Sequence, residues 1–352
     1  TTRMQPRRNR TLFSLLTLAA LLCFSPHAAA LAATDGRSLY AQAVEADDRV
    51  SYSGTLTTVV YEGDDDRASS TVTRIEHKAP SLWRIWYLAP ADAYGRMIVS
   101  DESLTYQYEP SRNRVISHEW NETAPGVAAP VNLPQVESNY SVDIGPATSV
   151  AGRKVTSLSL VSKHTGSLVQ RLWVDDQSKL ILRRESYSSE GNVASKSSFD
   201  GIRVGVDLPQ DLFRLTVPQG MTLVSGASYG KATTDVNDLV RGLNFKFAPP
   251  KYLPDGFVLE RGSLASHDGI NTVEFVYSDG LRTFSLFENA TGRLPRFDQA
   301  TPKTIGIGDA QGQYADVGGQ TLVSWNAGGL NFTIVGDLSP KESARIGASI
   351  HP

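Results

Sequence analysis

Hydrophobic and polar residues alternate with a period of two over most of this chain, most regularly in residues 151–204. Within this stretch Leu158 and Leu160 alternate with serines, which is the pattern of a strand with one face in water. Four runs of strand-forming residues are separated there by turn-forming residues: Val155–Val161, Leu168–Val174, Leu180–Tyr187 and Val193–Val204. The stretch therefore predicts an antiparallel meander without an intervening helix.

Strand patterns also fill the region before this meander. Val50–Tyr61 predicts a long strand, and a change of apolar parity near Thr57 indicates a β-bulge. Shorter strands are predicted at Ser69–His77, Leu82–Leu88, Gly95–Val99, Leu104–Tyr108 and Arg114–Ser117. Ahead of the strands, Asp35 as N-cap and apolar residues at helical spacing predict a helix over Arg37–Asp48. His118–Glu137 contains three prolines and predicts a loop or a lid.

A second β-rich region follows a change in composition. Residues 226–250 begin with glycine, serine and other small residues, and they predict a linker. Strands are then predicted within residues 251–352 at Phe257–Leu264, Thr272–Tyr277, Leu281–Glu288, Gly312–Val317, Thr321–Asn326 and Leu330–Val335. The last element is a predicted helix over Pro340–Ile350, with Ser339 as the N-cap of a capping box. The predicted fold class is mainly β (α+β), in two domains.

The first 33 residues have the composition of an export signal. Four arginines precede an apolar run at Leu12–Phe24, and small residues around Ala30 and Ala32 offer a cleavage site. The apolar run is shorter than the ~20 residues that span a bilayer, although a retained anchor is the alternative. Leu22 precedes Cys23 where a lipoprotein signal needs a small residue. We therefore expect residues 1–33 to be removed and the mature protein to be soluble, unlipidated and periplasmic.

The charge and cysteine content of the mature chain exclude several functions. The formal net charge is −3, and it becomes −7 when the four leader arginines are removed. An acidic exported protein is a poor candidate for nucleic-acid binding. Cys23 is the single cysteine and lies in the leader, so the mature chain has no disulfide, thiol nucleophile or thiolate metal site.

The residue motifs do not assemble an active site. Gly226–Gly230 matches the G-x-S-x-G pattern of hydrolases around Ser228, but that motif needs a parallel α/β sheet, which this pattern does not predict. The same stretch has the wrong spacing for a phosphate loop. The histidines are scattered and form no pair at metal-ligand spacing. We predict a protein that is not an enzyme and has neither cofactor nor metal.

Aromatic residues indicate a binding surface. Trp83, Trp86 and Tyr87 lie on both faces of one predicted strand, and a strand that is apolar on both faces must be covered on both. A strongly curved sheet wrapped around the N-terminal helix or the proline-rich segment would provide this cover, and its concave side could bind a lipid-like ligand. The residues predicted to line such a cavity are Tyr52, Leu56, Trp86, Tyr106, Tyr108, Leu158 and Leu160. An ordinary packed core is the alternative.

Four short motifs fall into two runs: Arg171–Asp175 (RLWVD) with Leu180–Arg183 (LILR), and Leu253–Phe257 (LPDGF) with Val276–Leu281 (VYSDGL). Both runs resemble segments of the MucB/RseB family of periplasmic regulators of envelope-stress sigma factors. The resemblance implies that residues 34–225 form an open β-barrel like that of the lipoprotein carriers LolA and LolB, and that residues 251–352 form the smaller domain.

The resemblance also implies a function. Proteins of this family bind the periplasmic part of a membrane anti-sigma factor, protect it from proteolysis and release it when an amphiphilic lipid or a lipoprotein acyl chain binds. The alternative is a LolA-like carrier of lipoproteins or lipids between membranes, which needs only the curved sheet. The sequence leaves the oligomeric state open, a homo-oligomer included.

Overall fold

The computed structural model describes residues 35–351, except residues 63–66, 102, 120–130, 226–227, 230–231, 237–238, 240, 242, 244, 247–248, 268–269, 293, 295–300 and 318–319. The expected leader, residues 1–33, lies outside the described residues. None of the helices within the described ranges combines the length and the apolar character needed to cross a membrane.

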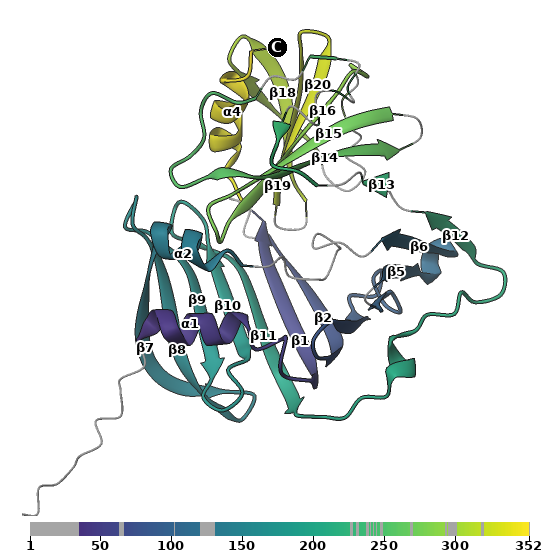
Figure 1. Cartoon of the computed structure of the whole chain (residues 1–352), viewed down its shortest axis with the longest axis vertical. Helices are drawn as coiled ribbons and strands as arrows, with labels where there is room; N and C mark the ends of the chain where they lie inside the picture. Colours follow the sequence, from purple (N-terminus) through teal and green to yellow (C-terminus); the bar gives the residue numbers. More distant parts are fainter. Residues whose placement is uncertain are drawn as a thin grey trace, which may run out of the picture. The chain divides into compact units, whose positions relative to one another are not determined.

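The first domain is built on one curved sheet of twelve strands (Figure 1). The strands are β1 Tyr52–Glu62, β2 Arg67–Lys78, β3 Leu82–Ala89, β4 Met97–Ser100, β5 Leu104–Glu109, β6 Arg114–Glu119, β7 Tyr140–Val150, β8 Arg153–Ser162, β9 Leu168–Asp175, β10 Ile181–Tyr187, β11 Val193–Val204 and β12 Thr222–Ser225. Their order is β12-β6-β5-β4-β3-β2-β1-β11-β10-β9-β8-β7. Edges remain at β12 and β7, so the predicted open, mainly β architecture is confirmed.

The sequence pattern located most of these strands and missed one. The predicted central meander corresponds to β8–β11, and β1 carries a register shift between Thr55 and Leu56, two residues from the predicted bulge. β7 was not predicted, because Gly145 and Pro146 interrupt its strand pattern. The register between β7 and β8 shifts at this place, between Ile144 and Ala147, and a bulge is a position where a sheet accepts proline.

Two short helices belong to this domain. The first, α1 Gly36–Val44, begins where the Asp35 carboxylate accepts a hydrogen bond from the Ser38 backbone N–H at 2.7 Å, as predicted. It lies against β8 and β9, where Leu39 and Tyr40 pack in one cluster with Leu158 (Figure 1).

The second helix, α2 Leu133–Asn139, corrects the C-terminal part of the loop predicted over His118–Glu137. Residues 120–130 of that prediction lie outside the described residues. The Asn132 side chain caps the backbone N–H of Gln135, and Pro134 occupies the first turn, where its missing N–H costs nothing. The prolines indicated a loop because they were counted as breakers, whereas one of them starts a helix. Two short 3-10 helices, η1 Pro110–Arg112 and η2 Gln210–Phe213, complete the domain.

The second domain is an eight-stranded sheet with its own core. Its strands are β13 Ser228–Tyr229, β14 Val258–His267, β15 Ile270–Ser278, β16 Thr283–Asn289, β17 Lys303–Ile307, β18 Ala310–Val317, β19 Gln320–Ala327 and β20 Leu330–Gly336. They pair in the order β13-β14-β15-β16-β20-β19-β18-β17. The final helix, α4 Pro340–Ala348, has the predicted capping box at Ser339. The segment predicted as a linker contributes β13 and the buried Leu239 to this domain.

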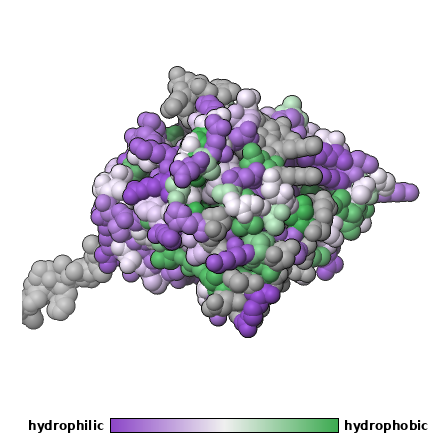
Figure 2. Space-filling model, turned by 90° about the horizontal axis from the view of Figure 1, so that it is seen from above, coloured by the Kyte–Doolittle hydropathy of each residue, from purple (hydrophilic) through white to green (hydrophobic). Residues whose placement is uncertain are grey.

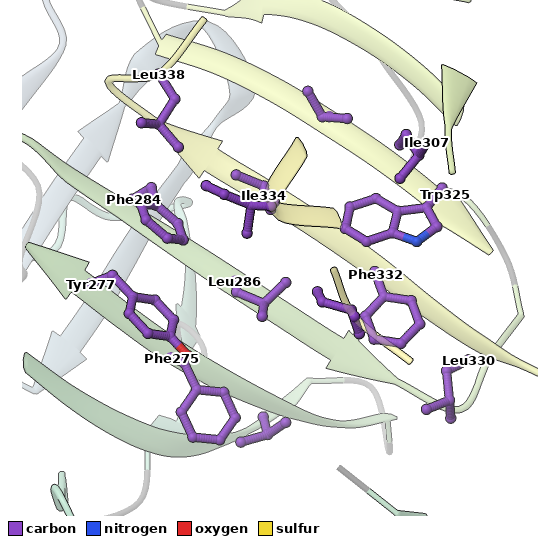
Figure 3. Packing of buried hydrophobic residues seen from close by; sticks show 14 of the residues in the cluster. Phe275, Tyr277, Phe284, Leu286, Ile307, Trp325, Leu330, Phe332, Ile334 and Leu338 are labelled. Carbon is purple, nitrogen blue, oxygen red and sulfur yellow. The ribbon is translucent and has the colours of Figure 1, made fainter. Parts of the chain in front are cut away.

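Close packing of large side chains fills the space between this sheet and α4. Trp325 and Phe332 stack with ring centroids 5.2 Å apart, and Tyr277 and Phe284 stack at 4.9 Å (Figure 3). Ile346 of α4 is fully buried in the same cluster. The second domain therefore buries an apolar core that is separate from the clusters of the first sheet.

Candidate functional site

The two domains meet where α2 and the first residue of β7 contact two turns of the second sheet. The Tyr140 hydroxyl donates a hydrogen bond to Asp279 Oδ2 at 2.7 Å, and the two residues are 2% and 1% exposed. The Arg282 guanidinium Nε donates to the same oxygen at 2.9 Å. One carboxylate that is almost completely buried thus receives a donor from each domain.

Side-chain amides of α2 extend the junction. Asn139 Nδ2 donates to the Asp279 backbone oxygen at 2.9 Å and to the Gly256 backbone oxygen at 3.1 Å. Its Oδ1 lies 2.9 Å from His164 Nε2, so every polar atom of this amide has a partner. Gln135 Nε2 donates to the Ser278 backbone oxygen at 2.5 Å. Buried polar groups are costly unless they are paired, so these bonds specify how the two domains fit.

Glycines make the close approach possible. Gly280 has φ +99°, and a Cβ built on it would lie 2.8 Å from the Val136 backbone nitrogen. Gly256 has φ +83°, and its Cβ would lie 2.8 Å from the Asn139 amide. Both the left-handed backbone and the contact with α2 exclude larger residues. The LPDGF and YSDGL segments are therefore the two turns that receive α2.

Charge at the junction is concentrated in a few buried groups. Burial and the neighbouring Asp279 carboxylate raise the pKa of the Tyr140 hydroxyl above its ordinary value, so it remains a donor. Burial also raises the pKa of Asp337, whose carboxyl interacts electrostatically with Arg282 and Asp279. The Arg282 guanidinium thus interacts electrostatically with the carboxyl groups of Asp279 and Asp337 and with the Tyr140 hydroxyl.

The residues predicted to line a cavity do not share one surface. Leu158 and Leu160 are 0% exposed and are covered by α1. Tyr52, His77 and Trp83 are successive cross-strand partners and therefore share one face of the sheet. Trp86 is an odd number of residues from Trp83 along β3, so it lies on the opposite face. Leu56 has the same parity as Tyr52 and packs in the same cluster.

Tyr52 lies in a buried polar stack. The His77 ring, 0% exposed, stacks on Trp83 with centroids 3.8 Å apart and lies 5.2 Å from the Tyr52 ring. Both His77 nitrogens meet backbone oxygens, of Leu82 at 3.0 Å and of Asp47 at 2.6 Å. The His77–Asp47 contact attaches the chain after α1 to the sheet. Tyr52 packs against the His77 ring, so it contributes to the packing of this part of the sheet.

The remaining predicted residues, Trp86, Tyr106 and Tyr108, belong to an apolar strip across the three strands β3–β5. Trp86 of β3, Met97 of β4, Tyr108 of β5 and Val115 of β6 are successive cross-strand partners, and Tyr106 pairs with Val99 two positions along. Trp86 is 38% exposed, and both tyrosines are half-buried. We call Trp86, Met97, Tyr106 and Tyr108 the aromatic strip. Seen from above, the molecular surface carries apolar patches among hydrophilic side chains (Figure 2).

The serine of the hydrolase-like motif does not lie in the type of sheet that this motif needs. Ser228 lies in the two-residue strand β13, which pairs antiparallel with β14, so it is not at a strand–helix elbow of a parallel sheet. Across the described residues, no three histidine, cysteine, aspartate or glutamate side chains gather closely enough to hold a metal ion.

Sequence reasoning missed the junction residues Gln135, Asn139, Tyr140, Asp279 and Arg282. The turn motifs around Gly256 and Gly280 were noticed, but nothing local indicates that a helix more than 100 residues earlier packs on them. The signal that could have pointed there was an Asx-type turn with an aspartate whose carboxylate has spare acceptor capacity.

The fold and the junction define a class: a β protein in which an open curved sheet is attached to a second sheet through buried polar contacts. Residues 35–217 match the family model described as the MucB/RseB N-terminal domain. The chain belongs to the MucB/RseB family, a family of regulatory binding proteins.

Solved structures share the fold of this chain. MucB in complex with MucA(peri) covers 90% of this chain and 99% of its own, at 18% identity and a TM-score of 0.60. MucB in the Pseudomonas aeruginosa MucA/MucB complex covers 90% and 98%, at 17% identity and a TM-score of 0.62. By sequence comparison, an uncharacterized protein of Methanocaldococcus jannaschii is 21% identical over a match that covers 72% of this chain and 76% of its own length. The structural similarity therefore extends over both domains.

Proposed function

We propose that this protein binds the periplasmic segment of a membrane anti-sigma factor and protects it from proteolysis. The observation that carries the proposal is the match over both domains to MucB bound to MucA(peri), in a chain of the same family. The buried junction supports it, because a carrier needs only the curved sheet, whereas a regulator needs two domains whose fit can respond to a ligand. We place the protein in the periplasm after removal of residues 1–33.

We further propose that an amphiphile opposes this binding. The aromatic strip offers half-exposed rings and the Met97 side chain on one face of β3–β5, and such a surface suits an acyl chain. Tyr52, Leu56, Leu158 and Leu160 would then support the sheet from its other face. The amphiphile would bind one arrangement of the two domains better, and the anti-sigma segment would prefer the other arrangement. The two ligands would therefore compete although they occupy different sites.

The first test is capture of an anti-sigma periplasmic segment by the full chain. We expect retention by the wild type and displacement by added phospholipid micelles. Tyr140→Phe, which removes one bond of the junction, should weaken capture, while Tyr187→Phe, which removes a comparable bond within the first sheet, should not. Capture unaffected by micelles would favour two independent sites and reject the coupling.

The second test concerns the aromatic strip. Tyr106→Asp should weaken binding of a fluorescent fatty acid at least tenfold with the protein still folded. Tyr61→Asp, the same change at a tyrosine 45% exposed on β1, should leave binding unchanged. Unfolding of the Tyr106 variant would instead mean that the strip is a closed core, because a charge in a closed core is strongly destabilising.

A further inference from the structure

Strand β12 leaves one side of its backbone available for pairing. It pairs in parallel with β6 on its inner side, and no other strand among the described residues pairs with its outer side. The Thr222 N–H donates to the Asn113 oxygen at 3.1 Å, so Thr222 and Val224 face β6. Because alternate residues of a strand bond to opposite sides, the N–H and C=O groups of Leu223 and Ser225 point outward. All four residues are exposed.

The other sheet edges are protected and this one is not. At the opposite edge of the first sheet, β7 carries Pro146 and a register shift. In the second sheet β13 has two residues, and the outer strand β17 carries Lys303. Prolines, bulges, charges and short length are the devices that prevent edge pairing. Strand β12 has four residues, twice the length of β13, and its sequence, Thr-Leu-Val-Ser, has no charge, proline or bulge. It exposes 54% of Leu223.

The edge is also held in an extended conformation before any partner arrives. Asn113, at φ +50°, accepts from Thr222 N–H through its backbone oxygen and donates from Nδ2 to the Gly220 oxygen at 3.0 Å. These two bonds fix the start of the strand against η1. A preformed strand does not lose this ordering entropy on binding, so added pairing contributes more to affinity.

The two faces of this edge differ in chemistry. On one face Leu223 pairs with Val115, which extends the aromatic strip to the edge. On the other face Thr222 pairs with Arg114, which pairs with Glu109. An added strand would therefore meet an apolar row on one side of the sheet and an ionic cluster on the other.

The ionic cluster has an excess of positive charge. Glu109 is 7% exposed and receives Arg114 Nε at 2.6 Å, Arg112 Nη1 at 3.7 Å and Arg96 Nη2 at 4.0 Å. The three arginine side chains are 34%, 58% and 41% exposed. Three guanidinium groups and one carboxylate leave a charge of +2 beside the start of β12, which complements acidic side chains.

We propose that the outer edge of β12 binds an extended peptide segment by strand addition, with apolar side chains next to Leu223 and acidic side chains next to Arg112 and Arg114. Backbone bonds to Leu223 and Ser225 supply affinity, and the two faces supply specificity. A second copy of β12 fits less well, because its four residues carry no carboxylate for the arginines. This inference is independent of the proposed anti-sigma binding.

The test uses the full chain and two fluorescent peptides of about ten residues with polar ends. One peptide alternates valine with glutamate and the other alternates valine with lysine. Fluorescence anisotropy should show saturable binding of the glutamate peptide and at least tenfold weaker binding of the lysine peptide. In hydrogen exchange measured by NMR, the Leu223 and Ser225 amides should become protected on binding, whereas Thr222 and Val224 should change little.

Variants separate backbone from side chain. Leu223→Pro removes an outward N–H and keeps the bonds to β6. It should therefore weaken binding of the glutamate peptide at least tenfold, which is more than Leu223→Ala should do. Arg112→Glu should also weaken binding of the glutamate peptide. Arg214→Glu, at an arginine that directly follows η2 and is 70% exposed, should leave this binding unchanged.

Four results would overturn the proposal. They are absence of binding by the glutamate peptide, equal binding of the lysine peptide, equal binding by Leu223→Pro, and protection of amides elsewhere than in β12. Analytical ultracentrifugation gives a fifth: a dimer abolished by Leu223→Pro would assign the edge to a second copy.

Discussion

Replacing Tyr140 by phenylalanine tests whether the two domains are coupled energetically. The ring remains, so packing is kept, and only the hydroxyl that donates to Asp279 at 2.7 Å is lost. The carboxylate keeps three other donors: Arg282 Nε at 2.9 Å and the backbone N–H groups of Leu281 and Arg282 at 3.0 and 2.8 Å. The loss is therefore one hydrogen bond to a charged group, worth about 1.5–3 kcal/mol, and not the full desolvation of a buried charge.

The assay must distinguish the domains, because a two-domain protein need not unfold in one step. Fluorine NMR of fluorotryptophan-labelled protein does so, since Trp325 lies in the second sheet and Trp83, Trp86 and Trp173 lie in the first. With a denaturant slope of about 3 kcal/mol per M urea, the expected loss lowers the midpoint by about 0.5–1 M. We expect the signals of both domains to shift, because the lost bond joins them.

The control removes a hydroxyl of the same kind elsewhere. Tyr187 donates to Glu185 Oε2 at 2.9 Å within the first sheet and is half-buried. Tyr187→Phe should cost less, and Trp325 should be unaffected. The reasoning is refuted if Tyr140→Phe costs no more than Tyr187→Phe, or if Trp325 unfolds at the same urea concentration in wild type and Tyr140→Phe.

Four further outcomes are expected. Gly280→Ala should cost at least about 2 kcal/mol in urea unfolding, because its Cβ meets Val136, whereas Gly292→Ala, at φ +60° with open space, should cost only about 1–2. Ser339→Ala should destabilise the second domain by about 1 kcal/mol through loss of the cap, measured by thermal unfolding. Burial opposes ionisation of the Asp175 carboxyl, but hydrogen bonds from Arg153 and Ser178 outweigh burial and lower its pKa. The stability that this carboxylate contributes should be complete above the unfolded pKa of about 3.9 and should be lost as the pH falls through the lower folded pKa. The stability of Asp175→Asn, measured against pH, should not show this loss. A fragment of residues 226–352 should show dispersed NMR signals on its own, since it has a separate core; a collapsed spectrum would contradict this.

Local patterns in the sequence determined the elements of this protein. The meander of β8–β11 follows from period-two alternation and turn residues, because a strand's side chains alternate whatever it pairs with. The Ser339 capping box closes within one helical turn, so it could be predicted from four consecutive residues. The class of fold and the family resemblance depend on such patterns, and both were confirmed.

Tertiary structure alone decided which residues act together. The predicted cavity residues are apolar and lie on strands, but pairing between strands placed Tyr52 and Trp86 on opposite faces. Asn139 and Tyr140 bond to Asp279, and nothing periodic relates residues so far apart in the chain. The openness of the β12 edge likewise depends on which strand follows β6 in the sheet. Patterns along a chain report which neighbours a residue has within a few positions, whereas junctions and edges depend on contacts that only the folded chain makes.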